Sequence, residues 1–285
     1  MGWVTGAVCV VAGLLGTVGL EAAERPNIVL ILADDMGYGD PGCYNPASRI
    51  PTPHIDRLAR QGLRLTDAHA PASVCVPTRY GLLTGRYPFR SRRSERTESR
   101  IEPGRLTLGG FLQQQGYRTA CVGKWHQGID WKLRDESARD VIRVHPNYQN
   151  FRNIDFASPV LKGPKDYGFD YSFATAGSAE MNPSTFIENN QATVIPTLSS
   201  EEAKEKYGEW YGRDDNIIAE GHTMDRLVPT LSKKACEFVE MATRTQPGQP
   251  FFLYYTPTQP HIGSRNVKGQ AHWPNARFKG TSQAG

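Results

Sequence analysis

After the N-terminal segment, the chain has a nearly unbroken apolar run, rich in β-branched residues, from Asn27 to Ala33. A run without polar alternation is typical of a strand that is buried on both faces of a parallel sheet. The run stops at two consecutive carboxylates, Asp34 and Asp35. The pattern therefore predicts a buried strand with an acidic pair directly after its carboxyl end.

The next stretch changes to the period of a helix. Ile55, Leu58 and Ala59 fall on one helical face, and Gly62 is placed to cap the end of the helix. Residues 63–70 then alternate between apolar and polar side chains, which predicts another strand. Together with the first strand, these segments predict a β-α-β unit.

The same succession of helix and strand is predicted twice more. In the first repeat, Thr107 can cap a helix that ends at Gly116, and the strand 117–122 leads to Lys124 and His126. In the second repeat, one apolar helical stripe over 231–242 precedes a turn and a strand that leads to His261. That strand has the sequence FFLYY.

The region between Gly128 and Pro229 is rich in Tyr, Asn, Pro and Gly and shows no sustained period. We interpret it as insertions and loops over one end of the sheet. No second composition regime and no internal repeat is visible, so the pattern favours a single domain. The predicted fold class is α/β, with a large, mostly parallel sheet flanked by helices.

Polar side chains follow three of the predicted strands: the acidic pair, then Lys124 with His126, then His261. Any one of them alone is more often a turn residue, a helix cap or a solvated loop residue than part of a site. In open α/β sheets, however, ligands bind at the carboxyl ends of the strands. Their convergence on one edge makes this edge the candidate site.

The charge and the cysteine content limit the functions that the sequence can indicate. The 285 residues carry 33 basic and 29 acidic side chains, a net charge of +4, which is too balanced to indicate nucleic-acid binding. An arginine-rich stretch over 86–100 is interpreted as a solvated loop in preference to a rim for anionic substrates. Of the five cysteines, Cys9 lies in the N-terminal apolar run, and the others show neither metal-site nor dense disulfide spacing.

The N-terminal segment, residues 1–23, contains an apolar run from Ala7 to Leu20 followed by small residues. The run is too short for a comfortable membrane span and is interpreted as a signal peptide for export to a periplasmic or extracellular location. We therefore expect no stable membrane span. The predicted catalytic domain is 24–285.

Cys75 lies at a predicted helix start, because Pro77 suits the first turn of a helix, and Arg79 lies one turn further on. The positive end of a helix stabilises an anion, either a thiolate or a bound oxyanion. Three interpretations of Cys75 stay open from these residues alone. They are a small buried apolar side chain, a catalytic thiolate, and an anion site beside a divalent cation held by the acidic pair.

The motif CVPTRYGLLTGR resembles the C-x-P-x-R signature of the sulfatase family, which belongs to the alkaline phosphatase superfamily. Further segments resemble this family: RPNIVLILADDMGYGDPGCY, TPHIDRLARQGLRLTDAHA, VGKWHQG, GPKDYGFDYSF and FFLYYTPTQPH. The resemblance covers essentially everything after the predicted signal peptide. It implies hydrolysis of sulfate esters by an arylsulfatase-like enzyme.

The resemblance also implies a chemical role for Cys75: it is oxidised to formylglycine by a formylglycine-generating enzyme, and the hydrated aldehyde attacks the sulfur. Asp34, Asp35 and the modified residue 75 would bind a divalent cation, with Ca²⁺ favoured over Mg²⁺ as runner-up. Lys124 would contact the sulfate. The substrate would be a sulfated small molecule or polysaccharide.

The remaining site residues also receive roles from the resemblance. Arg79 would hold the charge that forms at residue 75, and His126 would orient the modified side chain. His261 would protonate the leaving oxygen.

Two departures from the family pattern are His54, where Asn is usual, and Gly263, where Pro is common. In the family a further strand delivers an Asp-Asn or Asp-Gln pair to the metal and a further lysine to the sulfate, after the stretch that FKGTSQAG resembles. We therefore expect the chain to be the N-terminal part of a sulfatase catalytic domain, without the last strands. The alternatives to a sulfatase are a phosphomonoester or phosphonate-ester hydrolase of the same superfamily and an inactive fragment.

Overall fold

The computed structural model describes residues 25–91, 99–137, 151–179, 181–207 and 216–261. The predicted signal peptide, residues 1–23, lies outside the described residues. None of the described helices combines the length and apolar character that a membrane crossing requires. The helices are α1 Pro53–Gln61, α2 Cys75–Thr84, α3 Leu108–Gln114, α4 Ser200–Tyr207 and α5 Met224–Thr245, with short 3₁₀ helices at Pro88–Arg90, Phe151–Asn153 and Pro164–Tyr167.

The strands form one large sheet and one small one. They are β1 Ile28–Ile31, β2 Arg118–Lys124, β3 Tyr171–Thr175, β4 Phe186–Glu188, β5 Gln191–Ala192, β6 Leu198–Ser199, β7 Ile217–Ile218 and β8 Phe251–Thr256. The six-stranded sheet has the order β1-β8-β2-β3-β4-β5, and its first four strands run parallel. The strands β4 and β5 add antiparallel pairs at the far edge, and β6 pairs with β7. This confirms the predicted mostly parallel α/β sheet.

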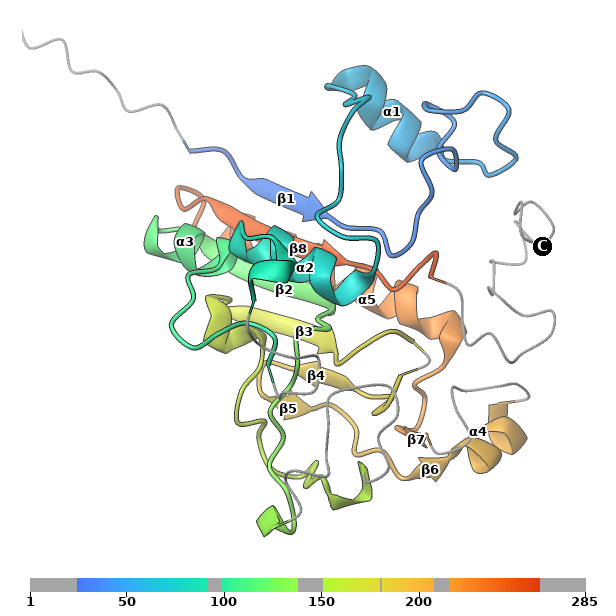
Figure 1. Cartoon of the computed structure of the whole chain (residues 1–285), viewed down its shortest axis with the longest axis vertical. Helices are drawn as coiled ribbons and strands as arrows, with labels where there is room; N and C mark the ends of the chain where they lie inside the picture. The colour runs from blue at the N-terminus through green and yellow to red at the C-terminus, as the bar shows by residue number, and fades with distance from the viewer. Residues whose placement is uncertain (1–24, 92–98, 138–150, 180, 208–215, 262–285) are drawn as a thin grey trace, which may run out of the picture.

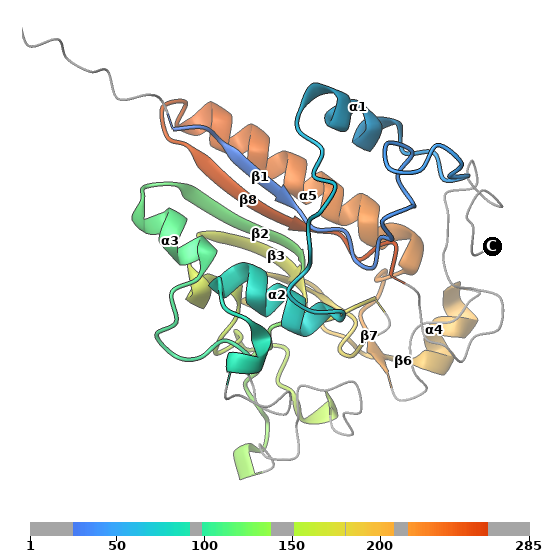
Figure 2. The same cartoon turned by 45° about the horizontal axis from the view of Figure 1, so that its top comes forward.

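Helices cover both faces of the sheet (Figures 1 and 2), with α2 and α3 on one face and α5 on the other. The strand side chains alternate accordingly. Cys121, Phe252 and Tyr254 belong to the larger core cluster, together with residues of α2 and α3. A second cluster combines Val122 and Leu253 with buried residues of the apolar stripe of α5, namely Leu231, Ala235, Phe238 and Ala242.

The prediction that the first strand is buried on both faces is wrong. Within the described residues, β1 pairs only with β8, so it is an edge strand, and its side chains alternate between partly buried and exposed. Val29 and Ile31 are 50% and 59% exposed. The predicted helix forms as α1, but none of its residues is buried.

The predicted strand over 63–70 is also wrong. These residues are exposed and form no strand, and the chain passes through them from α1 to α2. An alternating pattern specifies a strand only where a neighbouring strand completes the hydrogen bonds, and no described strand lies beside these residues. The first β-α-β unit is therefore not formed within the described part of the chain.

The region 128–229 contains more regular structure than its pattern predicts. It supplies β3, β4 and β5 to the main sheet, the small sheet β6–β7, helix α4 and the start of α5. The buried strand β3 is only 5 residues long, so no period can develop within it.

Candidate active site

The acidic pair lies just beyond the carboxyl end of β1, and its two members take different conformations. The Asp34 amide donates to the Gln259 carbonyl at 3.1 Å, which ties this turn to the segment after β8. Asp34 is buried, whereas the Asp35 side chain is 55% exposed. Asp35 has a φ of 64°, in the left-handed region, so the chain turns between the two carboxylates.

Asp34 is the centre of a buried ion cluster. The Lys124 ammonium donates to Asp34 Oδ2 at 2.7 Å, and Arg79 Nη2 donates to Asp34 Oδ1 at 3.1 Å. Arg79 Nη1 also donates to the Lys124 carbonyl at 2.7 Å. The two cations and the one carboxylate have a net charge of +1. The cluster therefore favours an anion beside it.

The position of Lys124 depends on a close approach between β2 and β8 at the preceding residue, Gly123. Gly123 has a φ of 119°, and a Cβ at this position would lie 2.0 Å from the Thr256 carbonyl oxygen. Only glycine fits such an approach. The Thr256 hydroxyl donates to the Lys124 carbonyl at 2.9 Å, which holds the end of β2 in place.

Cys75 is the first residue of α2, after the extended Val74. The sequence prediction of a helix start at this position is confirmed. Cys75 and Arg79 are four residues apart, so they lie on the same helical face, with about 5–6 Å between their Cβ atoms. The Gln127 side-chain amide, through Nε2, donates to the Val76 carbonyl at 2.8 Å and joins this first turn to the loop after β2. Cys75 therefore lies at a helix N-terminus, one turn from the buried cluster.

A second cysteine lies close to Arg79 but has a different environment. Cys121, on β2, is completely buried, and burial raises the pKa of its thiol to about 12, while the charge of Arg79 acts in the opposite direction. A thiol with this pKa is protonated at neutral pH. Cys75, in contrast, is partly exposed, so of these two cysteines it is the one that a bound molecule can reach.

The two predicted histidines follow β2 and β8. His126 has a φ of 52°, and its amide donates to the Ala176 carbonyl at 3.1 Å, which ties the loop after β2 to the loop after β3. His261 Nε2 lies 3.5 Å from Asp35 Oδ2. The structure thus joins Asp34 with Arg79 and Lys124, and Asp35 with His261.

Sequence reasoning missed Ser178. Its hydroxyl accepts a hydrogen bond from the Lys124 ammonium at 2.5 Å, and it is buried. Ser178 follows β3, so it lies at the same edge of the sheet as the other site residues. The signal that could have identified it is its place just after the segment GPKDYGFDYSF, but β3 itself was not predicted.

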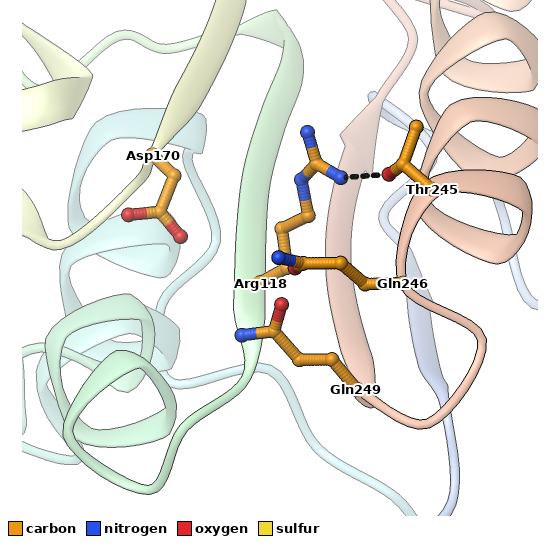
Figure 3. Close-up of a pocket in the computed structure, with 5 residues that line it drawn as sticks. All are labelled: Arg118, Asp170, Thr245, Gln246 and Gln249. Carbon is orange, nitrogen blue, oxygen red and sulfur yellow. Dashed lines mark hydrogen bonds between the residues drawn. The ribbon is translucent and has the colours of Figure 1, made fainter.

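A pocket of about 460 Å³ lies elsewhere on the molecule. Figure 3 shows its polar lining, formed by Arg118, Asp170, Thr245, Gln246 and Gln249. Arg118 is the first residue of β2, whereas Lys124 is the last. The pocket is therefore at the opposite end of the strand from the ion cluster, and it takes no part in the candidate active site.

The donor set fits a hard cation in part. Oxygen ligands suit Ca²⁺ and Mg²⁺, and a carboxylate that accepts from Lys124 and Arg79 still has lone pairs for a cation. Within the described residues, however, no group of three or more His, Cys, Asp or Glu side chains is arranged to hold a metal ion. Asp34 and Asp35 would thus supply only part of a coordination shell.

Comparison with known proteins gives a family match over most of the chain. Residues 26–284 match the family Sulfatase. The N-acetylgalactosamine-6-O-sulfatase of Bacteroides thetaiotaomicron is 32% identical over 93% of this chain and 52% of its own length. Human steryl-sulfatase is 43% identical over 46% of this chain and 23% of its own length. The chain thus spans about half or less of the length of these relatives.

Solved structures show the same fold. A structure described as "Metabolism of multiple glycosaminoglycans by bacteroides thetaiotaomicron is orchestrated by a versatile core genetic locus (BT33336S-sulf)" superposes with a TM-score of 0.67 at 27% identity, over 90% of this chain and 54% of the other. A structure of Ps i-CgsB in complex with k-i-k-neocarrahexaose has a TM-score of 0.52 at 25% identity, over 83% and 46% of the two chains. On the family match and the shared fold, the chain belongs to the sulfatase family.

Proposed function

We propose that this chain forms the nucleophile-bearing part of a sulfatase that hydrolyses sulfate esters, with Cys75 converted to formylglycine by a formylglycine-generating enzyme. The observation that supports this most directly is the buried cluster of Asp34, Arg79 and Lys124 one helical turn from Cys75. Such a cluster has surplus positive charge beside a helix N-terminus, which is the environment that a sulfate group requires.

Each side chain of the cluster has a role that follows from its contacts. Lys124 binds the sulfate, and Ser178 and Asp34 hold its ammonium group in position. Arg79 lies on the face of α2 that carries residue 75 and stabilises negative charge there. His126 orients the modified side chain from the loop after β2.

His261 is the proposed general acid for the leaving oxygen. Its Nε2 lies 3.5 Å from Asp35 Oδ2, and this contact holds the imidazole at the edge of the sheet where Asp34 and Lys124 lie.

The residues that would hold a divalent cation are Asp34, Asp35 and the modified residue 75, with Ca²⁺ favoured over Mg²⁺ because all these donors are oxygens. When bound, the cation would supply positive charge against the charge that develops on the nucleophile. Asp34 would keep its contacts with Lys124 and Arg79, because its two oxygens offer about four acceptor positions.

The proposed substrate class is a sulfated saccharide. The Bacteroides thetaiotaomicron relative is named an N-acetylgalactosamine-6-O-sulfatase, and Ps i-CgsB was solved in complex with k-i-k-neocarrahexaose. We further propose that the protein is exported and that it meets such a substrate in the periplasm or outside the cell.

The proposal is tested with the full-length sulfatase that contains this chain, co-expressed with a formylglycine-generating enzyme. We expect the peptide that contains residue 75 to show the mass of an aldehyde and to react with a hydrazide. We expect nitrophenyl sulfate to be hydrolysed faster than nitrophenyl phosphate, and Cys75→Ala to lose the activity. Faster turnover of the phosphate ester would favour the phosphoester hydrolase, and an unmodified thiol in active protein would refute the formylglycine mechanism.

A further inference from the structure

One buried side chain at the candidate site joins the two segments that carry Cys75 and His126. Gln127 is 1% exposed and follows His126 directly. Its Nε2 donates to the Val76 carbonyl at 2.8 Å and to the His126 carbonyl at 2.9 Å. Val76 is the neighbour of Cys75 in the first turn of α2, so one amide group spans both segments. The proposed roles described above give Gln127 no function.

The orientation of the Gln127 amide follows from the chemistry of its partners. Both partners are carbonyl oxygens, which accept hydrogen bonds and cannot donate them, so the amide nitrogen must face them. A primary amide has two N–H groups, which matches the two carbonyls. The amide oxygen has no partner among the described residues, so the two Nε2 contacts are the hydrogen bonds that hold this side chain there.

The loop that carries Gln127 is anchored independently of α2. The Trp125 amide donates to the carbonyl of Thr175, the last residue of β3, at 3.0 Å. The Trp125 indole donates to the Gly128 carbonyl at 2.8 Å, and the Arg100 amide donates to the Gln127 carbonyl at 2.9 Å. The backbone around residue 127 is thus fixed to the sheet, and its side chain extends this anchoring to the helix.

The contact with the His126 carbonyl supports an unusual backbone conformation. His126 has a φ of 52°, in the left-handed region that residues other than glycine rarely adopt. Such a conformation persists only where the surrounding contacts hold it. The Gln127 amide supplies one of these contacts, at the carbonyl of His126 itself. The direction of the His126 side chain therefore depends in part on Gln127.

The start of α2 is held to the sheet at two points. One turn along the helix from Cys75, Arg79 Nη1 donates to the Lys124 carbonyl at 2.7 Å. A helix held at one point can still tilt about that point. The Gln127 contact at Val76 is the second point, and it lies at the end of the helix that carries Cys75. The two contacts together fix the direction of this end.

We infer that Gln127 is a positioning residue, whose side-chain amide holds residue 75 and His126 in fixed relative positions by joining the first turn of α2 to the loop after β2. This inference rests on the proposed sulfatase function, in which residue 75 becomes the nucleophile and His126 orients it. It goes beyond that function by assigning a role to a side chain that acts through the backbone of its neighbours.

Gln191 provides a matched control at the far edge of the sheet. Its Nε2 also donates to two backbone carbonyls, those of Phe156 and Ala157, at 3.3 and 3.2 Å. Gln191 belongs to β5, four positions away from β1 and two from β3 in the sheet order. Gln127→Met and Gln191→Met remove the same kind of contact with little change in side-chain volume. One substitution lies beside the candidate site and the other lies away from it.

The first test does not depend on activity. Amide hydrogen exchange is followed by mass spectrometry in the full-length sulfatase that contains this chain. The Thr78 amide reports on the first turn of α2, and the Gly85 amide reports on its other end. In Gln127→Met we expect Thr78 to exchange at least about tenfold faster and Gly85 to change by less than about twofold. Neither amide should change in Gln191→Met, and equal Thr78 exchange in all three proteins overturns the inference.

The second test is kinetic and uses nitrophenyl sulfate. The value of kcat is expressed per aldehyde at residue 75, titrated with a hydrazide, so that incomplete modification is not counted as slower catalysis. Gln127→Met should lower this kcat about tenfold to a hundredfold, because a nucleophile misplaced by about 1 Å loses rate on this order, with KM changed by less than about threefold. Gln191→Met should keep both values. A rise in KM with an unchanged kcat would make Gln127 a substrate-binding residue and overturn the inference.

A second variant and the two readouts keep the outcomes distinct. If Gln127→Met does not fold, Gln127→Asn takes its place: its amide is one methylene shorter and does not reach both carbonyls, so the same changes are expected. If the unsubstituted protein has no sulfatase turnover, the proposed function loses support, and Thr78 exchange alone decides whether Gln127 holds α2. If Thr78 is released and kcat per aldehyde stays at the wild-type value, the positioning role is overturned and the proposed function stands.

Discussion

At the scale of single residues, we expect the adjacent Asp34 and Asp35 to contribute different amounts to the free energy of unfolding. Asp34→Asn would leave Lys124 and Arg79 buried without their carboxylate, and we expect a loss of about 3–5 kcal/mol in the free energy of unfolding. Asp35→Asn removes only a half-exposed partner of His261, so a loss below about 1 kcal/mol is expected. Urea denaturation of both variants measures the difference, and equal small losses would contradict a structural role for the Asp34 charge.

His222 is a residue whose burial should make stability depend on pH. Burial lowers its pKa to about 4. The unfolded chain therefore takes up a proton near pH 6.5 that the folded chain refuses until about pH 4, so the free energy of unfolding falls as the pH falls through this window. The expected contribution is on the order of 3 kcal/mol.

The measurement is the denaturation midpoint between pH 7 and pH 4 for His222→Gln. Glutamine stays neutral, so the dependence on pH in this window should become shallower. His69→Gln is the control, because the His69 side chain is 83% exposed and its removal should leave the pH dependence of the unsubstituted chain. A steep fall that persists in His222→Gln would assign it to other groups.

At the scale of secondary-structure elements, the position of Lys124 depends on the close contact between β2 and β8, which requires a glycine at position 123. Gly123→Ala would place a Cβ against the Thr256 carbonyl at a positive φ, and we expect a loss of at least about 2 kcal/mol in stability. The end of β2 would move, and Lys124 with it. Gly248→Ala, in a turn with no atom within 4 Å of the added Cβ, should be within about 0.5 kcal/mol of the unsubstituted chain. Thermal denaturation compares the two, and equal midpoints would contradict the role of Gly123.

At the same scale, the sequence predicted elements that fold by local rules. The Thr107 side chain caps α3 by accepting from the Gly110 amide, Gly116 follows the helix with a φ of 80°, and α2 begins at Cys75. Caps, turn residues and an apolar stripe are encoded within a few positions of one another, so they are visible without the fold.

Elements that depend on distant partners were not predictable in this way. Residues 63–70 alternate but pair with no strand in the described part of the chain, and the partner of β3 is β2, about fifty residues earlier in the chain. Ser178 was missed for the same reason, because its position is defined by that pairing. The convergence of Asp34 and Lys124 was predictable only through the rule that parallel strands end at one edge.

For the whole molecule, apolar side chains remain uncovered on the β1 edge and on α1. Besides Val29 and Ile31, the exposed large side chains include Leu58, Leu63 and Leu65. Single exposed apolar residues are common on protein surfaces. It is less common for one face of a strand to be exposed while the helix that follows it has no buried residue. These side chains should contribute little to the stability of the chain.

The comparison of two neighbours on β1 tests this directly. Leu30 packs against the core cluster, so Leu30→Ala should cost on the order of 2 kcal/mol in the free energy of unfolding. Ile31 points away from that core, and Ile31→Thr keeps a β-branched side chain, so its cost should stay below about 0.5 kcal/mol. Adding Leu58→Gln to Ile31→Thr should lower the fluorescence of a bound apolar dye such as ANS, because less apolar surface is exposed. If Ile31→Thr instead destabilises the chain as much as Leu30→Ala, the β1 face is covered in solution, and sedimentation at several protein concentrations would show whether a second copy covers it.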